Sequence, residues 1–288
     1  MTGSITEAYG RRLALVNSGL EAVLPPAGRE PRRLHEAMRH AVFGGGGGKR
    51  LRPVLLLSAA ADLGVGDDRA LPAALALELV HCYSLVHDDL PCMDDAGERR
   101  GAPSVHAAFG YAVALLAGDA LLTQAFEILG RAANSGLPRP GELLVELATA
   151  AGSGGMVGGQ DLDLALGEGG AGPAGPDLVL RVHRMKTAPL YGFALAAPAH
   201  LAGVPAAEVR RWREAGVNFG LAFQAADDLR DASEDRRAPN LAKAAGTARA
   251  REMARESLRE CEAALIDLAG LESGTLALVR AAAREMGL

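Results

Sequence analysis

Apolar residues recur at helical spacing along most of this 288-residue chain. Between positions 75 and 90, the apolar residues Leu75, Leu79, Cys82, Val86 and Leu90 follow one another three or four positions apart, which places them on one face of a helix. No alternating run of apolar and polar residues is long enough to predict a strand. The pattern therefore predicts an all-α fold, with helices at 5–24, 31–43, 51–63, 71–90, 105–134, 141–152, 156–167, 177–202, 206–232, 247–269 and 273–286.

The composition supports this prediction. Hydrophobic residues make up 49% of the chain and aromatic residues only 4%, and the abundant Ala and Leu favour helices. No Pro/Ser-rich or charged linker divides the chain, so we expect one domain over residues 1–288. The stretch from Thr187 to Ala207 has no charged residue and is long enough to cross a bilayer. Its prolines and glycines instead predict a buried helix followed by a turn, and we expect no membrane span.

Charge and cysteine usage narrow the function classes. A formal net charge of −5 gives no reason to expect a nucleic-acid partner. The three cysteines show neither metal-ligand spacing nor a disulfide framework, as in proteins of a reducing compartment. The first residues have no basic start and no apolar core, so we expect a cytoplasmic protein without a secretion signal.

Two acidic clusters interrupt the apolar pattern, one from Asp88 to Asp95 and one from Asp227 to Asp231. Carboxylates are rarely buried without partners, and Asp227 and Asp231 have the spacing that places them on one helix face. Hard oxygen ligands suit Mg²⁺, which fills its remaining positions with water and phosphate oxygens. The clusters predict a magnesium diphosphate site. The alternative is that each is a solvated helix end.

Basic residues supply the complementary signal. The run Gly44 to Gly48 precedes Lys49-Arg50-Leu51-Arg52-Pro53, and a glycine loop with cations at a helix start suits phosphate. The alternative is a flexible linker with solvated charges. Because Arg99, Arg100 and Lys186 add further cations, the acidic and basic segments together predict a site for two diphosphates.

These segments resemble the motifs of the trans-isoprenyl diphosphate synthases, the short-chain polyprenyl synthetases that include farnesyl and geranylgeranyl diphosphate synthases. The resemblance covers about Gly46 to Ala254. It is carried by Gly48-Lys49-Arg50-Leu51-Arg52-Pro53, His81-Cys82-Tyr83-Ser84-Leu85-Val86-His87-Asp88-Asp89-Leu90-Pro91, Arg99-Arg100-Gly101, Leu116-Ala117-Gly118-Asp119, Gly158-Gly159-Gln160, Lys186-Thr187 and Phe223-Gln224-Ala225-Ala226-Asp227-Asp228. It implies the isoprenoid synthase fold, with helices around a deep central cavity, a homodimer and Mg²⁺ as cofactor. It also implies that isopentenyl diphosphate is condensed with an allylic diphosphate such as dimethylallyl or geranyl diphosphate.

The resemblance also implies roles for individual residues. The metal ligands would be Asp88, Asp94 and Asp227, with Asp89, Asp228 and Asp231 as more distant metal partners. Positive charge around the leaving diphosphate would come from Arg99 and Lys186. The diphosphate of isopentenyl diphosphate would be bound by Lys49, Arg52, His81 and Arg100. The allylic cation would be stabilised by Thr187 and Gln224 with the carbonyl of Lys186. Gln160 and Asp163 match a polar pair near the metal site. Close helix approach or a kink, rather than chemistry, is expected at Gly152, Gly154, Gly155, Gly158 and Gly159.

The resemblance further implies that the growing chain extends toward Tyr83 and Ser84, five and four positions before Asp88, and that these residues set product length. Tyr83 is large enough to close the cavity floor, so we expect farnesyl diphosphate, with geranylgeranyl diphosphate as the alternative. The chain departs from the family after Asp231, where the usual Gly-Lys loop is missing and only Arg236 and Arg237 offer a replacement. Two other functions remain open, a terpene cyclase and a weakly active or non-catalytic partner subunit of a synthase.

Overall fold

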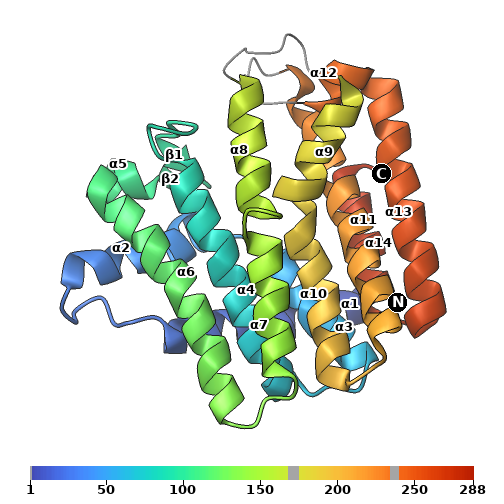
Figure 1. The fold of residues 1–288 in the computed structure, drawn as a ribbon, viewed down its shortest axis with the longest axis horizontal. Helices are drawn as coiled ribbons and strands as arrows, with labels where there is room; N and C mark the ends of the chain where they lie inside the picture. The colour runs from blue at the N-terminus through green and yellow to red at the C-terminus, as the bar shows by residue number, and fades with distance from the viewer. Residues whose placement is uncertain (1, 168–174, 234–239) are drawn as a thin grey trace. The chain divides into compact units, whose positions relative to one another are not determined.

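The protein is almost entirely helical in the computed structural model, which describes residues 2–167, 175–233 and 240–288 (Figure 1). The all-α prediction is confirmed. The longer helices are α1 (Thr2–Val23), α2 (Arg32–Phe43), α3 (Leu51–Asp62), α4 (Asp67–Asp88), α6 (Tyr111–Asn134), α7 (Pro140–Ala151), α8 (Met156–Gly167), α9 (Pro176–Lys186), α10 (Ala188–Ala202), α11 (Ala206–Arg230), α13 (Thr247–Ala269) and α14 (Gly274–Met286). Shorter elements are η1 (Gly44–Gly46), β1 (Glu98–Arg99), β2 (Ala102–Pro103), α5 (Val105–Phe109), η2 (Asp231–Ser233) and α12 (Leu241–Ala245).

Two helices predicted as continuous are each divided in two. The 105–134 prediction is wrong at Gly110, which separates α5 from α6 with a φ of +87° that glycine adopts without steric cost. The 177–202 prediction is wrong at Thr187, because Pro189 has no amide hydrogen to continue the hydrogen-bond pattern of α9. Thr187 keeps helical backbone angles, so the second division is a local interruption.

By their internal contacts the helices form two compact units. Unit 1 consists of Met1–Leu57 and Asp68–Pro140, and unit 2 of Ser58–Asp67 and Gly141–Leu288. The prediction of one domain over 1–288 stays a prediction. The first acidic cluster lies in unit 1 and the second in unit 2.

Unit 1 is organised by α4. This helix buries residues on all sides, which explains why its sequence is apolar almost throughout. It ends at Asp88, three residues before Pro91, since a proline disfavours helical geometry in the residue before it. In the same unit, α2 packs against α5 and α6. The apolar core therefore ends where the acidic cluster begins.

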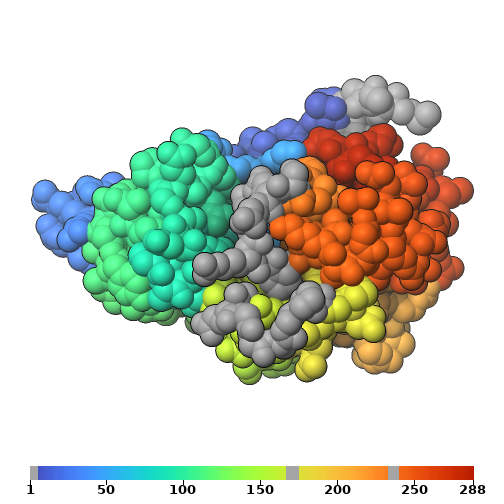
Figure 2. All heavy atoms as spheres, turned by 90° about the horizontal axis from the view of Figure 1, so that it is seen from above, coloured from blue at the N-terminus to red at the C-terminus, as the bar shows by residue number. Residues whose placement is uncertain are grey.

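Unit 2 contains the packed helices α10, α11 and α13, of which α11 contacts both others. As predicted, α10 is a buried helix, and it ends at Gly203. The outward side of α13 carries Arg251, Arg255 and Arg259 and lies in the orange surface of Figure 2. The carboxylate of Asp62, the last residue of α3, accepts hydrogen bonds from the backbone amides of Gly274 and Thr275 and so caps the start of α14.

Two helices are long and apolar enough to cross a membrane by length and composition alone. In α4, 67% of the apolar window is buried within the structure, which is ordinary for a core helix. In α6 only 33% of the window is buried, so an apolar face of α6 is exposed.

Candidate active site

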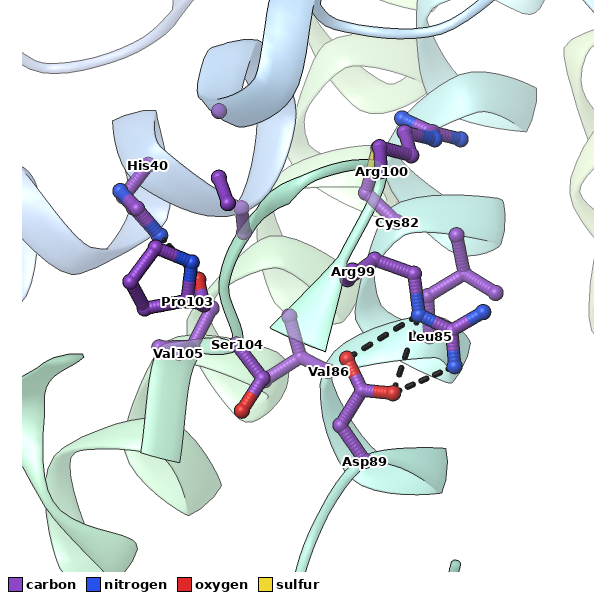
Figure 3. A pocket seen from close by; sticks show the side chains of 13 residues that line it. His40, Cys82, Leu85, Val86, Asp89, Arg99, Arg100, Pro103, Ser104 and Val105 are labelled. Carbon is purple, nitrogen blue, oxygen red and sulfur yellow. Dashed lines mark hydrogen bonds and ion pairs between the residues drawn. The ribbon is translucent and has the colours of Figure 1, made fainter. Parts of the chain in front are cut away.

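The first acidic cluster follows the end of α4. The chain turns back so that the backbone amide of Asp94 donates to the carbonyl of Asp88 at 2.9 Å. Asp89, which is 2% exposed, is bound by Arg99, whose Nε lies 3.0 Å and 3.2 Å from the two carboxylate oxygens (Figure 3). Arg99 therefore neutralises Asp89, whereas Asp94 is exposed and Asp88 half-buried.

A cysteine also lies in this cluster. Cys92 is exposed, and its sulfur lies 3.2 Å from the hydroxyl of Tyr111. The other two cysteines, Cys82 and Cys261, are buried, and all three are free thiols. Burial raises the pKa of Cys82 to about 12 and also raises that of Cys261.

The two consecutive arginines have different partners because a hairpin separates them. Strands β1 and β2 pair with Arg99 opposite Ala102, so Arg100 and Gly101 form the two-residue turn. Both turn residues have positive φ, 55° and 75°, as the hairpin turns that match strand twist require. Arg99 consequently faces the aspartate cluster, while Arg100 donates to the carbonyl of Gly47 at 3.0 Å. No strand was predicted here, since two residues per strand give no alternating pattern.

The glycine run is a defined turn rather than a flexible linker. Residues 45–48 all have positive φ, between 58° and 83°. A side chain at Gly45 would collide with the backbone of Arg100, and one at Gly48 with its guanidinium. Glycine is required here both for backbone conformation and for the close approach of Arg100.

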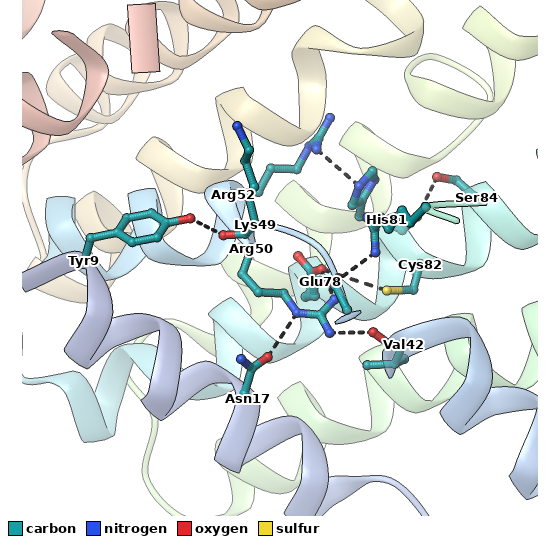
Figure 4. A network of polar contacts seen from close by, with 12 residues as sticks. Tyr9, Asn17, Val42, Lys49, Arg50, Arg52, Glu78, His81, Cys82 and Ser84 are labelled. Atoms are coloured by element: carbon teal, nitrogen blue, oxygen red, sulfur yellow. Dashed lines mark hydrogen bonds and ion pairs between the residues drawn. The ribbon is translucent and has the colours of Figure 1, made fainter. Parts of the chain in front are cut away.

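A buried ion pair fixes this loop to α4 (Figure 4). The guanidinium of Arg50 donates to Glu78 at 2.6 Å, and the two side chains are 0% and 2% exposed. Arg50 also donates to Asn17 on α1 and to the carbonyl of Val42 at the end of α2. Sequence analysis assigned no role to either member of the pair. The signal was Glu78 itself, a charge inside the apolar stretch of α4 that needs a buried partner.

His81 lies beside the predicted phosphate-binding cations. Its Nε2 is 3.3 Å from Nη1 of Arg52. Burial, followed by the charges of Arg52 and Arg100, lowers the pKa of His81 well below its ordinary value. His81 is therefore a neutral ring that accepts a hydrogen bond from Arg52. The exposed Lys49 is held through its backbone carbonyl, which accepts a hydrogen bond from Tyr9.

The predicted chain-length residues lie one turn before the cluster. Tyr83 is 5% exposed, its ring packs edge-on against His87 with centroids 5.7 Å apart, and burial raises its pKa to about 12. The ring of His87 fits because Gly118 on α6 has no side chain there. The hydroxyl of Ser84 donates to the carbonyl of His81, so it is engaged within its own helix.

In unit 2, Lys186 at the end of α9 is paired with Asp163 of α8, with 2.5 Å between Nζ and the carboxylate. A side chain at Gly159 would collide with the backbone of Lys186. The predicted close helix approach at this glycine is confirmed.

The second acidic cluster ends α11, and its members have separate partners. Asp227 pairs with Arg230 on the same helix. Asp228 is 5% exposed and lies 3.1 Å from Nε2 of His183. It also accepts hydrogen bonds from the side chain of Gln224 at 3.1 Å and from the amide of Leu241 at 2.6 Å. His183 was not predicted from the sequence, although it lies on α9 one turn before Thr187.

The predicted cation-stabilising pair is brought together, since the Thr187 hydroxyl donates to the Gln224 carbonyl oxygen at 2.8 Å. Arg236 and Arg237, the proposed replacements for the missing loop lysine, lie outside the described residues.

Carboxylate oxygens are suitable ligands for Mg²⁺, but some carboxylates of the two clusters already have hydrogen-bond partners. Over the described ranges, no group of three or more His, Cys, Asp or Glu side chains lies close enough together to hold a metal ion. Mg²⁺ commonly takes only one or two protein carboxylates and completes its shell with water and substrate phosphates. Asp88 and Asp94 supply such carboxylates from adjoining backbone, whereas Asp89 and Asp228 are already hydrogen-bonded.

Comparison with known proteins agrees with these motifs. Residues 31–247 match the family model described as polyprenyl synthetase. The chain is 40% identical to a geranylfarnesyl diphosphate synthase of Leucosceptrum canum over 82% of this chain and 63% of the relative. It is 42% identical to a farnesyl diphosphate synthase of Geobacillus stearothermophilus over 70% of this chain and 67% of the relative. The chain thus spans less than two thirds of the length of the geranylfarnesyl diphosphate synthase that it matches.

Solved structures resemble the whole chain. The crystal structure of an FPP/GFPP synthase from Zymomonas mobilis superposes with a TM-score of 0.87 at 37% identity, covering 99% of both chains. A geranyltranstransferase from Thermotoga maritima gives 0.85 at 31% identity, covering 97% of this chain and 98% of the other.

Proposed function

We propose that this chain, which belongs to the polyprenyl synthetase family, is a trans-prenyltransferase that condenses isopentenyl diphosphate with an allylic diphosphate. The observation that carries the proposal is the pairing of an aspartate cluster with ordered cations in unit 1. Arg100 packs into a glycine turn next to Lys49, and Arg52 contacts His81. A protein that only retained the fold would have no need for this arrangement of charges.

The cations and His81 suit the diphosphate of isopentenyl diphosphate. Lys49 is exposed, and Arg52 presents a planar fork that matches phosphate oxygens. His81 stays neutral among the arginines, so it adds a hydrogen bond without adding repulsion. Together these side chains bind the diphosphate that does not leave, and so position the double bond of isopentenyl diphosphate for attack.

For the leaving group, we propose that Asp88, Asp94 and Asp227 hold Mg²⁺. When bound, the metal supplies charge stabilisation to the departing diphosphate. Asp231 completes the second cluster, and Lys186 adds positive charge near it. Asp89 and Asp228 act through hydrogen bonds to Arg99 and His183 rather than as direct ligands.

Thr187 and Gln224 are proposed to stabilise the allylic cation. The hydroxyl oxygen of Thr187 keeps its lone pairs while its hydrogen is donated to Gln224. An oxygen fixed in this way presents negative partial charge to a developing cation without reorganisation.

For product length we propose farnesyl diphosphate, with geranylgeranyl diphosphate as the alternative. The support is the size, burial and fixed orientation of Tyr83 against His87. A ring in that position leaves less room for a growing apolar chain than an alanine would.

We further propose a homodimer formed through the exposed apolar face of α6. Tyr111, Leu115 and Leu116 are 46%, 39% and 55% exposed and lie on neighbouring turns. A second copy of the chain would cover this apolar face. The competing explanation of the apolar face is that α6 spans a membrane. Analytical ultracentrifugation should show a dimer, and Leu116→Glu should shift it toward monomer.

We also propose a cytoplasmic location, which the three free cysteines support.

The activity is tested by incubating purified protein with Mg²⁺, isopentenyl diphosphate and dimethylallyl, geranyl or farnesyl diphosphate, and then sizing the products. Farnesyl diphosphate from the first two primers is the expected result. Cyclised hydrocarbon without chain elongation would favour a terpene cyclase. No product from any pair would favour a non-catalytic partner subunit.

A further inference from the structure

Helices α9 and α11 are joined by two hydrogen-bonded pairs with matching spacing. His183 lies on α9 one turn before Thr187, the residue that caps the end of this helix, and Gln224 and Asp228 lie one turn apart on α11. Thr187 bonds to Gln224 at 2.8 Å, and His183 bonds to Asp228 at 3.1 Å. Since both pairs use i,i+4 positions, they form the two rungs of a ladder between the facing sides of the helices.

Asp228 is the centre of this ladder. One carboxylate oxygen accepts from Gln224 at 3.1 Å, and the other accepts from the amide of Leu241 at 2.6 Å and lies nearest to His183. The side chain amide of Asn240 donates to the backbone carbonyl of the same aspartate at 2.9 Å. A carboxylate that is 5% exposed and has a donor at each oxygen is satisfied without a metal.

The geometry also fixes the role of His183. The ring is 4% exposed, and its Nδ1 is buried without a hydrogen-bond partner among the residues described. A hydrogen on Nδ1 would therefore be unpaired, whereas a hydrogen on Nε2 points to Asp228. His183 acts as a directional donor to one carboxylate oxygen.

We propose that His183 is a positioning residue for the reacting centre, which makes this inference rest on the proposed function. Through Asp228 it holds α9, with Lys186 and Thr187 at its end, in register with α11. A one-residue slide of α9 along α11 would break both rungs. The same carboxylate anchors the first turn of α12 at Leu241, so His183 positions three helices around one acidic cluster.

Apolar packing also holds these helices together, independently of the ladder, and this makes the proposal testable. A buried apolar cluster of Val179, Ala225, Leu241, Ala242 and Ala250 joins α9, α11, α12 and α13. Loss of one ring should therefore leave the fold intact while releasing the ladder.

The test compares His183→Leu with His183→Gln, whose side chain amide can restore a donor near the position of Nε2. The matched control is His200→Leu. His200 is a histidine with a side chain 12% exposed that lies 3.3 Å from Glu146 and belongs to a different cluster. The hydrogen exchange of a peptide covering α12 is measured first. The kcat and KM values with geranyl and isopentenyl diphosphates are then determined separately.

His183→Leu should speed exchange at the start of α12 and lower kcat, each by about tenfold or more, as expected for losing a hydrogen bond to a charged group. The KM for isopentenyl diphosphate should stay within about twofold, because its site lies on other elements. His183→Gln should recover most of both losses, and His200→Leu should change neither.

Unchanged α12 exchange and kcat in His183→Leu would overturn the proposal, as would equal losses in His200→Leu. If the wild type turns over no substrate pair, the proposed function fails, and thermal stabilisation by Mg²⁺ with inorganic diphosphate replaces kcat. Weaker stabilisation of His183→Leu than of His200→Leu would then support the positioning role. Equal stabilisation would refute it.

Discussion

Replacing Glu78 by leucine should destabilise the protein severely, because it leaves the guanidinium of Arg50 buried without a counter-charge. The two side chains are 2% and 0% exposed. After the change, Arg50 retains only neutral acceptors in its described contacts, Asn17 and the carbonyl of Val42. Removing one partner of such a pair costs about 3–5 kcal/mol. A domain has only about 5–15 kcal/mol of stability, so the loss is a large fraction of the total.

Urea denaturation followed by circular dichroism measures this cost. The matched control is Glu127→Leu, which removes an exposed i,i+4 pair with Arg131 and should cost about 0.3–0.5 kcal/mol. The double variant Glu78→Leu with Arg50→Met should recover much of the loss, since it removes both charges. A cost for Glu78→Leu no larger than that of the control would refute the buried-pair reasoning.

Three further predictions concern the candidate site, and a fourth concerns the ion pairs of Glu146. Asp88→Asn should lower kcat by about a hundredfold or more with an unchanged circular dichroism spectrum, and normal turnover at saturating Mg²⁺ would contradict its role as a ligand. Lys49→Ala should raise the KM for isopentenyl diphosphate by about tenfold and that for the allylic substrate far less, whereas equal rises would reject the pocket assignment. Tyr83→Ala should shift products to longer chains by chromatography, and an unchanged distribution would make Tyr83 a core residue only. Burial would raise the pKa of Glu146, but hydrogen bonds from His200 and Arg213 lower it to about 2. Ionised Glu146 therefore contributes fully to stability above its ordinary pKa of 4.5, and this contribution is lost as pH falls toward 2. The urea midpoint of Glu146→Gln should accordingly change less with pH over this range than that of the wild type.

The helices were predictable from the sequence because long apolar periodicities determine them. The two divisions were not, since Gly110 and Pro189 act through single backbone positions inside patterns that stay helical on both sides. The α12 helix escaped prediction for a different reason. It has five residues, and its stability comes from the Asn240 side chain bound to the Lys243 amide and from Asp228 thirteen positions earlier.

The residue types of the candidate site were predictable, but their pairings were not. Sequence spacing placed Asp227 and Asp231 on one helix face. It gave no means to see that Asp228 between them is buried against a histidine 45 positions earlier. Likewise, the adjacent arginines Arg99 and Arg100 read as one basic pair, and only the hairpin turn separates their partners. Tertiary contacts of this kind leave no local pattern in the sequence.

Because only one of the three cysteines is exposed, a thiol reagent can label the first aspartate cluster selectively. Thiol reagents attack the thiolate, which the raised pKa values of Cys82 and Cys261 suppress at neutral pH, while their burial also blocks access. Cys92 is exposed between Asp89 and Asp94. A maleimide fluorophore should therefore attach at this one position of the unmodified protein, without removal of any other cysteine. The dye would report, by its emission, the arrival of a cation or a substrate at the carboxylates on either side of it.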